Sequence, residues 1–166
     1  MKPTAILYTS ASGHTRQYAE LFGEKTGLPV YSLEEACAKL PSGCPVIYMG
    51  WIRASHIMGY ARAAKRFTLC AACGVGLCDT GTLKAEVRKA TGIAEIIPLF
   101  TMQGGMEHSS LRGISRFVIA MLTKGLAAKK QRTAQDDRML ELLRSDASYV
   151  SESNLSALLD WYTAKN

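Results

Sequence analysis

A loop near the start of the chain has the composition of a phosphate-binding site. It lies between an apolar run and a helical pattern, and it consists of Ser10, Ala11, Ser12, Gly13, His14 and Thr15. Small residues and a glycine allow the backbone to wrap closely around a bound group. The N–H groups at the start of a helix favour an anion, and Ser10, Ser12 and Thr15 add hydroxyl donors. The other interpretation is a polar loop that only caps the helix.

The loop differs from the other common nucleotide-binding loops. It has no lysine, so it is not the Gly-Lys-Ser/Thr loop of nucleotide triphosphatases, and it lacks the three glycines of the dinucleotide fingerprint. We therefore expect backbone amides and hydroxyl groups, not an ion-pairing side chain, to hold the phosphate.

The elements around this loop follow an alternating pattern. Five apolar runs have the character of buried strands, and they cover residues 4–9, 28–31, 46–50, 67–75 and 94–101. Helical patterns separate them at residues 18–25, 33–40, 58–66 and 82–90. This alternation predicts an α/β fold with a doubly wound parallel sheet.

The tail after the fifth run is longer than such a sheet needs. It contains helical patterns at residues 111–124, 134–144 and 155–162, and the last is sufficient to complete the sheet. We therefore expect a single domain over residues 1–166, with an added helical segment at about 111–152.

The loop Ser10–Thr15 resembles the Ser/Thr-x-Thr/Ser-Gly-x-Thr loop of flavodoxins, which lies at the same place between the first strand and the first helix. The resemblance implies a five-stranded parallel sheet of order 2-1-3-4-5 with helices on both faces and extra C-terminal helices. It also implies that FMN is the cofactor, with its phosphate held by Ser10, Ser12, Gly13, His14 and Thr15.

The resemblance implies that two further loops hold the isoalloxazine ring at the carboxyl ends of the strands. The loop at residues 50–56 contributes Trp51, Ile52 and Arg53, and the loop at residues 102–108 contributes Gln103, Gly104 and Gly105. Trp51 either stacks on the flavin or is a half-buried structural residue. Gly104 and Gly105 either let backbone amides approach the pyrimidine edge or form a plain turn.

Some features depart from flavodoxins: the later loop has no tyrosine, the tail is long and the net charge is +6. The chain is more similar to the flavodoxin-domain proteins related to menaquinone-dependent protoporphyrinogen oxidase. The corresponding stretches are Gly50-Trp51-Ile52-Arg53 and residues 111–132. This resemblance implies an oxidoreductase or electron-transfer protein whose partner is a quinone, an anionic porphyrinogen or another protein. A flavodoxin-like domain that binds no flavin and serves as a binding or regulatory module is the alternative.

Other residue clusters do not predict chemistry of their own. Cys70, Cys73 and Cys78 have a metal-like spacing, but strand alternation sends Cys70 and Cys73 to opposite faces, so we expect buried thiols and no metal. The three histidines, at positions 14, 56 and 108, all fall in predicted loops. None of them receives a catalytic role from the sequence, and no catalytic residue is assigned.

The tail has an apolar run at residues 114–122, followed by Lys124, Lys129, Lys130 and Arg132. It is either an interfacial helix on an anionic membrane or a helix packed on the sheet with a solvated basic end. No segment approaches the roughly 20 apolar residues that span a bilayer. We expect a cytoplasmic protein, or one peripheral to the inner face of the membrane, with no nucleic-acid partner.

Overall fold

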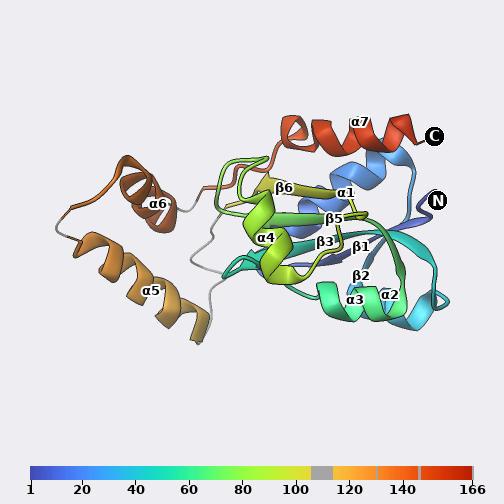
Figure 1. Ribbon diagram of the computed structural model, residues 1–166, viewed down its shortest axis with the longest axis horizontal. Helices are drawn as coiled ribbons and strands as arrows, with labels where there is room; N and C mark the ends of the chain where they lie inside the picture. Colours follow the sequence, from blue (N-terminus) through green and yellow to red (C-terminus); the bar gives the residue numbers. More distant parts are fainter. Residues whose placement is uncertain (106–113, 130, 146, 166) are drawn as a thin grey trace.

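The computed structural model describes residues 1–105, 114–129, 131–145 and 147–165. Five parallel strands form one sheet in the order β2 (Val30–Ser32), β1 (Ala5–Thr9), β3 (Pro45–Arg53), β5 (Thr68–Gly76) and β6 (Leu99–Gln103) (Figure 1). This is the flavodoxin-like strand order that the resemblance of the loop Ser10–Thr15 to that of flavodoxins implies. The carboxyl ends of the strands, and the loops that follow them, therefore meet at one edge of the sheet.

Helices cover both faces of the sheet, as predicted (Figure 1). On one face, α2 (Leu33–Lys39), α3 (Tyr60–Arg66) and α4 (Lys84–Thr91) contribute to an apolar core. On the other face, α1 (His14–Thr26) and α7 (Ser156–Ala164) form the second core. Alternate residues of β1 belong to the two cores, with Leu7 in the first and Ile6 in the second, because successive strand side chains point to opposite faces.

Two predicted boundaries are wrong. The segment predicted as a loop after the third strand is a β-hairpin, because β3 continues to Arg53 and pairs antiparallel with β4 (His56–Ile57). The fifth parallel strand begins at Leu99, not at residue 94, so Gln103 is its last residue and not part of a loop. Ile96 is 90% exposed, and the apolar character of residues 94–97 therefore does not reflect a buried strand.

The tail forms an arm that projects from the α/β body (Figure 1). The arm contains α5 (Ile114–Ala127) and α6 (Ala134–Arg144), and the chain returns through a 3-10 turn, η2 (Glu152–Leu155), into α7. An isolated antiparallel bridge between Gly105 and Ser148 joins the two ends of the excursion. Among the described residues, no helix is both long enough and apolar enough to cross a membrane.

Parts of the sequence analysis fall outside the described part of the chain. These are His108, Lys130, the end of the loop at residues 102–108 and the start of the helical pattern at residues 111–124.

Candidate functional site

The loop between β1 and α1 ends at a helix N-terminus that no side chain of the described residues caps. Gly13 occupies the N-cap position with φ of 92°, in the left-handed region that favours glycine. A Cβ atom built on Gly13 would meet no atom of the described residues within 4 Å, so the space beside the helix start is open with respect to them. The first N–H groups of a helix have no partner within the helix, and they carry partial positive charge. An open, uncapped helix start of this kind is suited to an anion.

Hydrogen bonds within the loop hold its shape. The N–H of Gly13 donates to the Ser10 hydroxyl over 3.1 Å, which leaves the Ser10 O–H able to donate to a ligand. The Ser12 hydroxyl lies 2.8 Å from Nδ1 of His14. His14 and Thr15 are buried, with exposed fractions of 6% and 1%. Of the predicted phosphate residues, Ser10, Ser12 and Gly13 are thus the more accessible ones, and His14 and Thr15 belong to the base of the loop.

A hydrogen bond between Tyr48 on β3 and Thr9 links that strand to the last residue of β1 before the loop. The Tyr48 hydroxyl donates to the carbonyl of Met58 over 2.6 Å, and it lies 2.8 Å from the Thr9 hydroxyl. Burial raises the pKa of Tyr48 to about 12, and its bond to Thr9 acts in the opposite direction. A side chain on Gly59 would collide with the Tyr48 hydroxyl, so glycine is required there for packing as well as for its φ of 83°. These contacts therefore fix the end of β1 against the segment that follows β4.

The hairpin after β3 separates the three residues that the sequence grouped together. Its turn consists of Ala54 and Ser55, both with positive φ. Ile52 packs across Gly74 and Gly76 of β5, since a Cβ atom on Gly74 would lie 2.8 Å from Ile52 Cδ1. Alternation puts Trp51 on the opposite face, where it pairs in register with Val75 and is half-buried. Arg53 is exposed at the end of the hairpin.

The loop that follows β6 lies against the phosphate-loop candidate. A Cβ atom on Gly104 would lie 3.2 Å from the His14 Cβ, and one on Gly105 would lie 3.0 Å from the His14 Nε2. The two loops therefore lie so close together that a Cβ atom at either glycine would make an unusually tight contact with His14. The N–H of Gly104 donates to the Gly76 carbonyl over 2.7 Å, and its carbonyl accepts from the N–H of Tyr149. Both backbone groups of Gly104 are thus used in holding the loop.

Gln103 holds a loop that the sequence analysis did not single out. Its side-chain amide donates to the carbonyl of Leu77, and its backbone N–H donates to the Thr80 hydroxyl. Residues 77–83 connect β5 to α4 at the same edge of the sheet, and β5 lies directly beside β3. The signal that would have found this loop is its position after a central strand of the parallel sheet, together with its glycine, aspartate and threonine content.

A buried tyrosine joins α1, β6 and the returning tail. The Tyr18 hydroxyl donates to the carbonyl of Gln103, and it accepts from the Asn154 side-chain amide over 2.8 Å. The same Asn154 amide reaches the carbonyl of Tyr149. This network includes the carbonyl of Gln103, the residue before the two glycines of the β6 loop, and it ties the point where the arm leaves the body to the point where it returns.

The described residues contain no group of three or more histidine, cysteine or acidic side chains that could hold a metal ion. Cys73 is fully buried, whereas Cys70 and Cys78 are partly buried. Burial raises the pKa of all three thiols, so they are protonated at neutral pH. Protonated thiols are poor metal ligands and poor nucleophiles.

Comparison of the chain with protein-family models, with curated proteins and with solved structures gives no match. The flavodoxin-like description therefore rests on the strand order and on the helices that flank the sheet.

Proposed function

We propose that this protein is an FMN-binding flavoprotein that acts in electron transfer or as an oxidoreductase. The observation that carries the proposal is the β1–α1 loop, in which an uncapped helix N-terminus opens onto free space beside Gly13. A phosphate monoester fits such a site because it accepts several N–H and O–H donors at once. When bound, the flavin supplies the redox chemistry.

Different residues at this edge of the sheet are candidates to bind the phosphate and the ring of FMN. The N–H groups at the start of α1 are the candidate donors to the phosphate, with the Ser10 O–H beside them. The contact between Ser12 and His14 orients the Ser12 hydroxyl. Trp51 is the candidate for the ring, because Ile52 is committed to packing over Gly74. Gly104 and Gly105 let the loop after β6 lie close against His14, at the base of the phosphate loop.

The charge of the chain supports an anionic partner. The sequence has 20 basic and 14 acidic residues, and the exposed Arg53 extends from the hairpin beside the site. Positive charge attracts anionic substrates and favours a reduced, anionic cofactor. A quinone or an anionic porphyrinogen, met in the cytoplasm or at the inner membrane face, fits these properties better than a basic carrier protein does.

One observation favours the alternative of a flavodoxin-like module without flavin. The N–H of Gly104 and the amide of Gln103, which a flavin ring would be expected to use, both make internal hydrogen bonds. In that case the loops at the sheet edge would bind a protein or a small anion without redox chemistry.

The absorption spectrum of the purified protein separates these functions, because bound flavin absorbs in the visible range. Apoprotein is then titrated with FMN and with riboflavin, which lacks the phosphate. We expect FMN to bind much more tightly, and Ser12→Asp to weaken FMN binding by a few kcal/mol through like-charge repulsion. Ser42→Asp is the control, because Ser42 is an exposed residue in the turn before β3. Equal affinities for FMN and riboflavin would refute the proposal.

A further inference from the structure

The two faces of α5 have an unusual division of side chains. Its half-buried residues recur at helical spacing and form one stripe along the helix: Ile119, Thr123, Leu126 and Ala127. The exposed residues on the remaining surface, its outer face, include Met121 and Leu122, which are 58% and 48% exposed. A surface helix of a globular protein normally places polar residues there. Packing among the described residues of the chain thus does not explain why Met121 and Leu122 are apolar.

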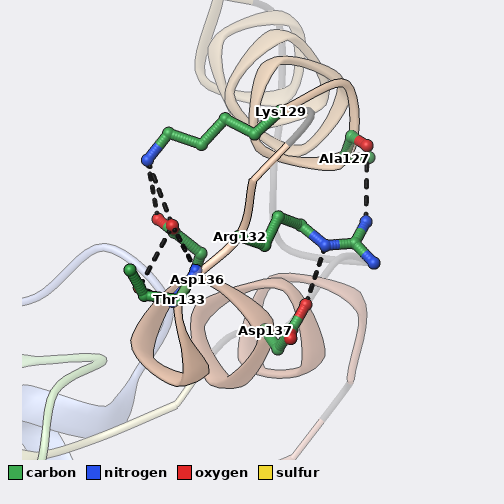
Figure 2. A network of polar contacts seen from close by, with 6 residues as sticks. All are labelled: Ala127, Lys129, Arg132, Thr133, Asp136 and Asp137. Atoms are coloured by element: carbon green, nitrogen blue, oxygen red, sulfur yellow. Dashed lines mark hydrogen bonds and ion pairs between the residues drawn. The ribbon is translucent and has the colours of Figure 1, made fainter.

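The arm keeps α5 in position through polar contacts with the start of α6. Lys129 Nζ lies 2.9 Å from Asp136, and Arg132 Nε lies 2.8 Å from Asp137 (Figure 2). Thr133 caps α6 by accepting from the N–H of Asp136, whose carboxylate in turn accepts from the Thr133 N–H. These contacts define the connection between the two helices, and they neutralise two of the cations that follow α5.

The arm is nevertheless strongly basic. Residues 114–144 contain three acidic side chains, at positions 136, 137 and 141, and seven basic ones, at positions 116, 124, 129, 130, 132, 138 and 144. The net charge of this segment is therefore +4, out of +6 for the whole chain. Lys124 is exposed on α5 itself, and it belongs to the same outer surface as Met121. Exposed apolar side chains and unneutralised positive charge therefore occur on one helix.

We propose that the outer face of α5 binds the surface of a membrane that contains anionic phospholipids. Met121 and Leu122 enter the boundary between headgroups and acyl chains, and Lys124 contacts the lipid phosphates. The helix is 14 residues long, so it lies on the membrane and does not cross it.

A lipid surface fits this face better than a second copy of the chain does. Two arms with the same net charge of +4 repel each other, whereas an anionic bilayer attracts them. A stable protein interface also buries about 800 Å² on each partner. The exposed apolar side chains of α5 among the described residues are two large ones and Ala120, which is a small patch by that measure.

The test is sedimentation of the purified full chain with vesicles of phosphatidylcholine, with and without phosphatidylglycerol, at increasing NaCl concentration. We expect binding to the anionic vesicles that weakens with salt, and little binding to the neutral ones. The double substitution Met121→Ser with Leu122→Ser lowers the partition coefficient about tenfold, and Lys124→Gln lowers it about fivefold. Ile96→Ser is the matched control, because Ile96 is 90% exposed on the body and its replacement leaves binding unchanged.

A second measurement places the contact. Met121→Trp is expected to show a blue shift of its added fluorescence when anionic vesicles are present, and Ile96→Trp is expected to show none. No binding, equal binding to both vesicle types, or an unshifted Met121→Trp spectrum overturns the proposal. A dimer in solution that the Met121 and Leu122 substitutions dissolve also overturns it, because the face is then covered by a second copy. The outcome does not depend on whether the protein carries a flavin.

Discussion

Replacing Gly13 by alanine tests the phosphate loop with two separable effects. Gly13 has φ of 92°, and a Cβ atom there meets nothing within 4 Å, so the cost to folding is conformational and not steric. Placing an L-residue in the left-handed region costs about 1–2 kcal/mol. For a domain of this size, each kcal/mol lowers the melting temperature by about 2–4 °C. We therefore expect Gly13→Ala to melt roughly 2–8 °C below the wild type.

The effect on ligand binding has a different origin. The added methyl group occupies part of the open space beside the uncapped helix start, where the phosphate is proposed to bind. Hydrogen bonds to a charged group contribute about 1.5–3 kcal/mol each, so losing one weakens FMN binding about ten- to hundredfold. Riboflavin binding should change little, because riboflavin has no phosphate to displace. Fluorescence titration of apoprotein with both ligands measures the two affinities.

Gly43→Ala is the matched control for this experiment. Gly43 has φ of 78°, also meets nothing within 4 Å, and lies in the turn before β3 at the opposite edge of the sheet. It should show a similar loss of thermal stability without any loss of FMN affinity. If both variants bind FMN equally well, or if Gly13→Ala weakens riboflavin as much as FMN, the loop does not hold the phosphate.

Two further predictions concern aromatic residues. If Trp51 contacts the flavin ring, FMN quenches tryptophan fluorescence and Trp51→Ala removes most of the quenching. Trp161 lies on α7 and packs against Phe100, so it should contribute little to the quenching. Quenching that persists unchanged in Trp51→Ala contradicts the contact. Burial raises the pKa of Tyr48 from 10.0 to about 12, so the stability that its neutral form contributes is complete below pH 10 and is lost as pH rises through about 12. Urea unfolding across that interval should show a loss of up to roughly 3 kcal/mol in the wild type. In Tyr48→Phe that part of the loss is absent, and an identical pH dependence in both proteins refutes the assignment.

The sheet was predictable because its inner strands are buried on both faces. The runs at residues 4–9, 46–50 and 67–75 are almost wholly apolar, and burial between two helix layers requires that pattern. The helices between them show their apolar positions at helical spacing, as at Tyr18 and Phe22, which are fully buried in the structure. Local sequence and tertiary burial agree at these places, so the strands and helices were predictable, whereas the strand order came from the resemblance to flavodoxins.

The hairpin was not predictable by the same reasoning. Its turn residues are Ala54 and Ser55, both in the left-handed region, which normally selects asparagine and glycine. Nothing local signals the turn. The antiparallel pairing of Ile52 with Ile57 and the bond from the Ile57 N–H to the Thr91 hydroxyl are tertiary contacts that stabilise it. The fifth strand was misplaced for the opposite reason, because Ile96 and Ile97 are apolar but precede Pro98 in a turn.

The candidate site was predictable in outline, since loops after parallel strands meet at one edge. What the sequence could not indicate is how its groups are shared. The amide of Gln103 supports the β5–α4 loop, and the N–H of Gly104 pairs with Gly76, because these bonds join strands that are far apart in the chain. The role of Tyr18 as the junction of three elements is non-local in the same way.

The bridge between Gly105 and Ser148 makes the arm separable from the body in evolutionary and in engineering terms. The two residues are already neighbours across an antiparallel pair, so a chain that omitted the segment between them could be rejoined by a short turn. The entropy of closing a loop grows only with the logarithm of its length, so carrying the long excursion costs the sheet little more than carrying a turn would. The arm can therefore lengthen, shorten or change its surface chemistry while the strands, and the loops at their carboxyl ends, keep their positions.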